Sequence, residues 1–151
     1  MADSVIVGLD FGTSGVKLAA VSPDGTTLYS AFAGYPTYTG ASAISATSGG
    51  FATTASAVTG SAVTGSAEQD PTDWWAAARQ VCGELAAAGL ADRVVALGVT
   101  GQMQDLVPVH AATPSTAASA TYPALLYSDP RARREHAVLA GQLPGWDDPT
   151  R

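Results

Sequence analysis

Residues 8–17, GLDFGTSGVK, place a carboxylate, two hydroxyls and an amine around a glycine-rich turn. Glycine has no Cβ and accepts positive φ, so backbone N–H groups in such a turn can approach an anion closely. The hydroxyls add donors, the carboxylate is suited to hold Mg²⁺ directly or through water, and the amine offsets negative charge nearby. The pattern predicts a phosphate site built from Asp10, Gly12, Thr13, Ser14 and Lys17.

This site differs from the P-loop, because the chain has no G-x-x-x-x-G-K-S/T stretch and no helix is expected after the turn. An ordinary tight hairpin explains the same residues, with glycine and serine serving only the turn and Lys17 a solvated strand residue. Taken alone, the residues leave both interpretations open.

Composition limits the possible functions. The chain has 151 residues, 46% of them hydrophobic and 13% charged, which indicates one domain with a packed core. Its net charge of −6 disfavours nucleic acid and anionic membranes as partners, because both attract clustered Lys and Arg. Cys82 is the single cysteine, which excludes an internal disulfide and suits a reducing cytosol. With no signal peptide or membrane span recognised, we expect a soluble cytoplasmic protein.

Hydrophobic patterning predicts an α/β fold. Strands are expected over 4–9, 16–22 and 27–33 as an antiparallel meander, followed later by strands at 93–99, 105–110 and 123–127. The strand at 93–99 has the continuous apolar pattern of a buried strand. Two low-complexity insertions, at about 39–67 and 111–121, interrupt this order. We expect the first to be a disordered loop, because it has few large apolar groups to offset its ordering entropy.

Two helices are expected. The first has Asp70 as N-cap, Pro71 at its first position and Gly89 where it should stop. Its apolar residues form one stripe, which comprises Trp74, Ala78, Val81, Cys82 and Leu85. Cys82 is therefore expected to be a core thiol. The second helix follows Asp129, which is read as its cap, and Pro130.

Four stretches occur in a recognisable order: GLDFGTSGVK at 8–17, AEQDPTDWW at 67–75, ALGVTGQMQDLV at 96–107 and PALLYSDPRA at 123–132. Together they resemble the N-terminal part of carbohydrate kinases of the FGGY family, the xylulokinases most of all. The resemblance implies a ribonuclease-H-like domain of the actin, hexokinase and sugar-kinase superfamily, present here in incomplete form. It also implies transfer of the γ-phosphoryl group of ATP, with Mg²⁺, to a sugar hydroxyl.

Site residues carry over position by position. The resemblance implies ATP contacts at Asp10, Gly12, Thr13, Ser14 and Lys17, with Asp10 also the Mg²⁺ ligand, and sugar contacts at Gln102, Met103, Gln104 and Tyr127. From the residues alone, Met103 can also be read as a core gap-filler at a strand end. Xylulokinases have His where this chain has Gln104, and the family usually has Gly where this chain has Asp105. The sugar is therefore left open, with glycerol, gluconate and ribulose as alternatives to xylulose.

The neighbouring positions have weaker interpretations. Glu68, Gln69 and Asp70 are read as a cleft wall or a helix cap, and Trp74 and Trp75 as core residues. His110 and His136 lack a partner cluster that would indicate a metal site. Arg131 and Glu135 have the i, i+4 spacing of a solvated helix pair.

The family's catalytic Asp base is expected beyond Arg151, so no catalytic residue is assigned within the chain, which we expect to be inactive alone. A non-catalytic sugar- or nucleotide-binding module is the alternative of another class. An actin- or chaperone-type ATPase shares the first motif but lacks counterparts of EQDPTDWW and GVTGQM. The expected partner is a small-molecule sugar, and a homodimer of the full-length enzyme is left open.

Overall fold

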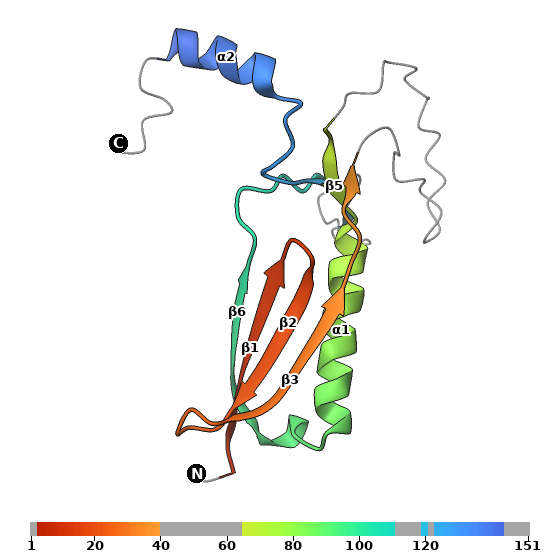
Figure 1. The fold of residues 1–151 in the computed structure, drawn as a ribbon, viewed down its shortest axis with the longest axis vertical. Coiled ribbons are helices and arrows are strands. Elements are labelled where there is room, and N and C mark those ends of the chain that lie inside the picture. The colour runs from red at the N-terminus through yellow and green to blue at the C-terminus, as the bar shows by residue number, and fades with distance from the viewer. Residues whose placement is uncertain (1–2, 40–64, 111–118, 121–122, 144–151) are drawn as a thin grey trace.

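The computed structural model describes residues 3–39, 65–110, 119–120 and 123–143. Its main sheet has four strands in the order β3-β2-β1-β6 (Figure 1). Strands β1 (Val5–Gly12), β2 (Gly15–Val21) and β3 (Thr27–Gly34) form the predicted antiparallel meander, and β6 (Val94–Gly101) joins β1 in parallel. The expected α/β class is confirmed.

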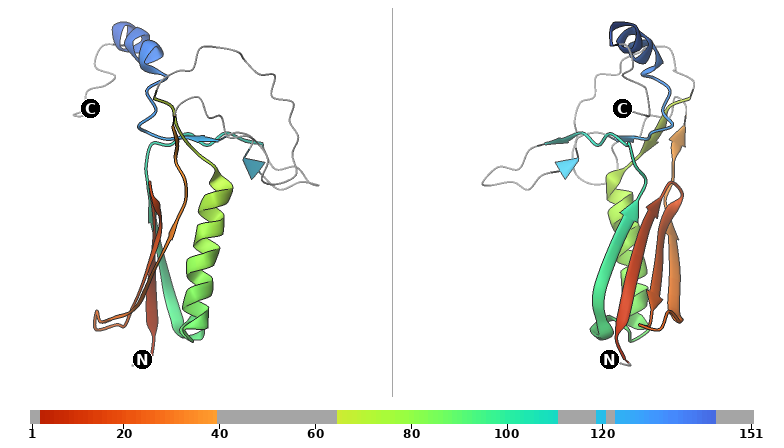
Figure 2. Two further views of the ribbon diagram at one scale, coloured as in Figure 1. Left: turned by 45° about the vertical axis from the view of Figure 1, so that its right-hand side comes forward. Right: turned by 90° about the vertical axis from the view of Figure 1, so that its left-hand side faces the viewer.

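Helix α1 (Pro71–Ala87) lies along one face of this sheet (Figure 2). The Asp70 carboxylate accepts a hydrogen bond from the Thr72 N–H, as an N-cap does, and Gly89 has φ +72° just after the helix. Both predicted helix ends are confirmed. The core between helix and sheet comprises Val5, Val7, Leu9, Val16, Leu18, Ala20, Ala33, Tyr35, Ala77, Val81, Leu85 and Leu90.

Two residues predicted in this core lie outside it. Cys82 is exposed, and Trp75 is 67% exposed, whereas Trp74 is half-buried against the core. The buried stripe runs through Ala77 and Val81 instead. Each residue turns the helix by about 100°, so position 82 points well away from Val81, while position 77 lies only about 40° from it.

A second, three-stranded sheet lies beyond the end of the main sheet at which β1 stops (Figure 1). It contains β4 (Tyr38–Thr39), β5 (Ala67–Gln69) and β9 (Ala124–Leu125), so the outer positions of the expected 39–67 loop are paired strands. The strands expected at 105–110 and 123–127 are shorter in the structure, where they correspond to β7 (Val109–His110) and β9. Strand β8 (Ser119–Ala120) pairs with β7. Most of both low-complexity insertions lies outside the described residues.

The C-terminal helix begins later than expected. A short 3-10 turn η1 (Ala91–Arg93) precedes β6, and helix α2 spans Arg133–Gln142 with Ala132 as N-cap and no side-chain cap. Asp129 is therefore not the predicted cap. Its carboxylate accepts the Ala67 N–H at 3.0 Å and pairs with Arg131 at 2.6 Å. Arg131 also pairs with Glu68 at 2.6 Å, and it precedes α2 rather than forming the expected helix pair.

Strand β6 is exposed along most of its length, contrary to the predicted buried strand. Helix α1 packs on β2 and β3, so it leaves the apolar side chains of β6 uncovered. Among the described residues, no helix is long and apolar enough to cross a membrane.

Candidate functional site

Hydrogen bonds from Tyr35, Thr37 and Gln69 hold the carbonyl groups of the turn between β1 and β2. The Tyr35 hydroxyl donates to the Gly12 carbonyl, and the Tyr35 N–H donates to the Ser14 carbonyl at 3.3 Å. The Thr13 carbonyl accepts from Gln69 Nε2 at 2.7 Å and from Thr37 Oγ1 at 3.3 Å. Burial raises the pKa of Tyr35, and the charges of Asp10 and Asp105 raise it further, so its hydroxyl stays protonated and donates.

We call these hydrogen bonds the clamp. They fix the direction of the N–H groups on the opposite side of the turn. In a trans peptide the C=O and the following N–H point in opposite directions. Because the carbonyls of Gly12 and Thr13 point into the clamp, the N–H groups of Thr13 and Ser14 point away from it. The side chains of these two turn residues are exposed. Backbone N–H groups and hydroxyls on one exposed turn are suited to a phosphate.

Gly15 is required by close packing. A Cβ built there would lie 2.4 Å from the Ala33 carbonyl oxygen and 2.7 Å from the Phe32 ring. The turn therefore has no space for a side chain at this position.

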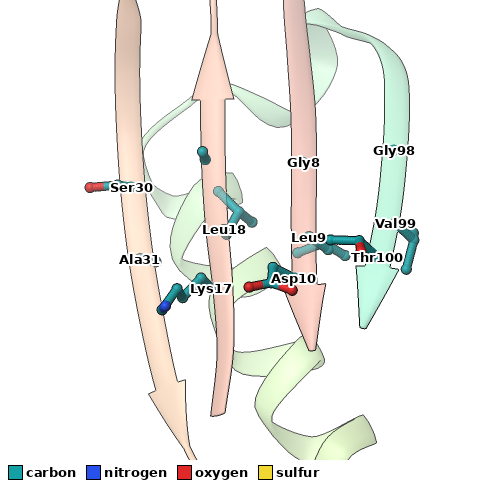
Figure 3. Close-up of a pocket in the computed structure, with 11 residues that line it drawn as sticks. Gly8, Leu9, Asp10, Lys17, Leu18, Ser30, Ala31, Gly98, Val99 and Thr100 are labelled. Carbon is teal, nitrogen blue, oxygen red and sulfur yellow. The ribbon is translucent and has the colours of Figure 1, made fainter. Parts of the chain in front are cut away.

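Asp10 and Lys17 are cross-strand partners beside the turn. They line a broad, open hollow of about 640 Å³ in the main sheet, and Figure 3 shows them side by side with α1 behind the strands. Four small residues, which are register partners across the four strands, form the floor of this hollow: Gly98, Gly8, Ala19 and Ser30. The Asp10 carboxylate and the turn hydroxyls are oxygen donors of the kind Mg²⁺ prefers, so the residues present fit a magnesium–phosphate group.

A second pocket, of about 260 Å³, lies beyond the end of β6. We call it the Gln102 pocket; it is lined by Phe11, Trp74, Gly101, Gln102, Gln104, Asp105 and Val107. Of the predicted sugar residues, Gln102 and Gln104 line it together, and Gln104 has φ +65°. Met103 and Tyr127 are exposed and do not line it.

A single buried amide joins the turn to this pocket. Gln69 is fully buried, and its Nε2 donates to the Thr13 carbonyl and to Thr37. Its Oε1 accepts from Trp74 Nε1 at 2.8 Å and from Gln102 Nε2 at 2.9 Å. The two predicted sites thus share one hydrogen-bonded network.

Sequence reasoning missed three parts of this arrangement. It placed Gln69 in a cleft wall or helix cap without its hydrogen bonds, it did not foresee the hydrogen bond of the Trp74 indole, although Trp74 does pack against the core as predicted, and it gave Asp105 no role. Asp105 lines the pocket and accepts the Tyr127 N–H at 2.9 Å. The sequence signal that pointed toward this network is the stretch AEQDPTDWW. In it, an amide residue stands just before a helix cap, and a tryptophan follows in the first turn of the helix.

A scan against protein-family models gave no match, and neither did a search of curated proteins. The fold does match solved kinases. A xylulose kinase from Rhodospirillum rubrum is 26% identical, with TM-score 0.66 over 93% of this chain and 24% of its own. A "xyloylose kinase" from Brucella ovis is 25% identical, with TM-score 0.66 over 91% and 24%.

A gluconate kinase from Lactobacillus acidophilus shares the fold at 17% identity, with TM-score 0.66 over 92% of this chain and 23% of its own. The chain therefore spans about a quarter of the length of these kinases. Its resemblance to the FGGY carbohydrate kinases is confirmed, and its sheet and helix form part of their ribonuclease-H-like fold.

Proposed function

We propose that this chain is part of a kinase that transfers the γ-phosphoryl group of ATP to a hydroxyl of a small sugar, with a xylulose-like ketose as the preferred acceptor. The observation that carries the proposal is the Gln69 network, which joins a phosphate-type turn to a pocket of amide and carboxylate groups. Phosphoryl transfer depends on holding a nucleotide phosphate and an acceptor hydroxyl in fixed relation.

Within this proposal, the N–H groups of Thr13 and Ser14 bind phosphate oxygens, Gly12 allows close approach, and Gly15 lets the turn pack against Ala33 and Phe32. Asp10 holds Mg²⁺, which neutralises phosphate charge when bound, and Lys17 adds a positive charge beside it. Gln102 and Gln104 bind sugar hydroxyls, and Met103 and Tyr127 contact the sugar when further parts of the enzyme close over it. We assign no catalytic base to this chain, which we expect to be inactive alone.

The partner is a small-molecule sugar rather than nucleic acid or a membrane, in keeping with the net charge of −6. The single cysteine suits a cytoplasmic setting. A homodimer of the full-length enzyme is part of the same proposal.

The test is sugar-dependent ADP release by the product of the full reading frame that encodes these residues, with and without Asp10→Asn. We expect the variant to lose on the order of a hundredfold in turnover, because the carboxylate positions the metal at the phosphates. The control is Asp92→Asn, the same chemical change at an exposed position in η1. Sugar-independent ATP hydrolysis, or Asp10→Asn turnover equal to that of the control, contradicts the proposal.

A further inference from the structure

Two buried acceptor atoms in the Gln102 pocket lack a hydrogen bond. Gln102 Oε1 and Asp105 Oδ2 receive none from any part of the chain that the structure describes. Both residues line the pocket. A buried acceptor without a partner costs about 1–3 kcal/mol, so a pocket ligand that donated a hydrogen bond to either atom would gain binding free energy.

The orientation of the Gln102 amide follows from its neighbours. The indole N–H of Trp74 is only a donor, so the Gln69 atom that it contacts must be the carbonyl oxygen, Oε1. Gln102 reaches the same oxygen, and must therefore present its Nε2 there. Its Oε1 is left as an acceptor without a donor, on a side chain that lines the pocket.

The orientation of Asp105 is fixed as well. Its Oδ1 accepts the Tyr127 N–H at 2.9 Å, which leaves Oδ2 as the free acceptor. An amide oxygen and a carboxylate oxygen can both accept a hydroxyl proton, and a hydrogen bond to a charged group is stronger than one between neutral groups. The carboxylate also repels an anionic ligand in a partly buried site.

We infer that Asp105 is a specificity-determining residue, which with Gln102 selects a neutral polyhydroxy ligand and rejects sugar acids. This inference rests on the proposed function and narrows its substrate class, because it disfavours gluconate among the alternatives. Phe11 and Trp74 also line the pocket and supply apolar surface for the ligand's C–H groups.

Binding to the 151-residue chain, at concentrations at which sedimentation shows it to be monomeric, tests this directly, because the pocket is lined by the chain's own residues. Xylitol serves as the neutral probe and gluconate as an anionic polyhydroxy probe, each titrated while the Trp74 indole N–H signal is followed by NMR. We expect xylitol to bind in the millimolar range and gluconate to bind at least about tenfold more weakly.

Asp105→Asn is the informative variant, because its carbonyl oxygen still accepts the Tyr127 N–H while an amide group replaces the free acceptor. We expect xylitol affinity to fall about tenfold and the discrimination against gluconate to disappear. Asp92→Asn, outside the pocket, should behave as wild type. Equal unfolding midpoints in urea for the two variants would show that the fold is retained.

Each other outcome overturns the inference. These outcomes are xylitol failing to bind, gluconate binding as tightly as xylitol, or Asp105→Asn leaving the preference unchanged. They are separable from failure of the proposed function, which is read from sugar-dependent ADP release by the longer protein. A kinase that is active but indifferent to Asp105→Asn keeps the function and loses the specificity residue.

Discussion

Gly15 is the residue at which the proposed phosphate turn tolerates no side chain. Gly15→Ala would place a Cβ 2.4 Å from the Ala33 carbonyl oxygen, so the strand pair must shift. We expect a loss of about 2 kcal/mol in the free energy of unfolding, measured by urea denaturation. Gly83→Ala is the matched control, because a Cβ there meets nothing within 4 Å on α1 and should stabilise the helix by about 1 kcal/mol. Equal effects of the two changes would contradict the packing argument.

Asp129 gives the fold a predictable response to acid. Its burial acts to raise its pKa, but hydrogen bonds from Arg131 and Ala67 outweigh this, and the pKa lies below its ordinary value. A lowered folded-state pKa stabilises the fold above the unfolded-state value of 3.8, and this contribution is lost as pH falls through the folded-state pKa.

Asp129→Asn should therefore cost about 1 kcal/mol at neutral pH, the upper end for a partly exposed ion pair. The difference from wild type should shrink as pH falls below about 4. Urea denaturation at neutral and acidic pH measures both values, and a constant difference would argue against the ion pair.

At the scale of elements, helix α1 shows which features of a helix depend on local sequence and which depend on tertiary packing. Its ends are predictable, because capping by Asp70 and termination at Gly89 are local chemistry. Which apolar residue faces the sheet depends on where the helix axis sits, and the structure buries Ala77 where the periodicity favoured Cys82.

Cys82 tests this placement. In the native chain we expect its thiol to react with an aromatic disulfide reagent at close to the rate found in urea, because it lies on the exposed side of α1. A native rate about a hundredfold slower than the rate in urea would show that Cys82 is buried in the core, as the sequence periodicity predicted.

The meander and α1 were predictable because apolar, β-branched runs separated by turn residues mark strands, and an apolar stripe between capping residues marks a helix. Strands β5 and β9 have only three and two residues, too few for a periodic signal, and their pairing joins positions far apart in the chain. The same limit applies to the site. The turn residues were visible as a local motif, whereas the Gln69 network and the orphan acceptor of Asp105 arise only when separate elements meet.

At the scale of the whole molecule, the main sheet presents an apolar face that the described chain leaves uncovered. Leu97 is the cross-strand partner of the buried Val7, yet it is 60% exposed because α1 packs on β2 and β3. Val95 and Val99 on the same strand are exposed to a similar degree. The chain spans about a quarter of the length of the kinases it matches, and we propose that further parts of such a kinase cover this face.

Left uncovered, this face and the outer edge of β6 should make the isolated chain self-associate, because the strand carries no charged residue or proline to block pairing. We expect Leu97→Lys to keep the chain monomeric at concentrations at which wild type associates, as measured by sedimentation, at little cost in stability since the side chain is already exposed. Ala96→Lys introduces the same charge on the opposite face of the strand and should reduce association less. If both variants associate as wild type does, the uncovered face of β6 is not the surface through which the chains meet.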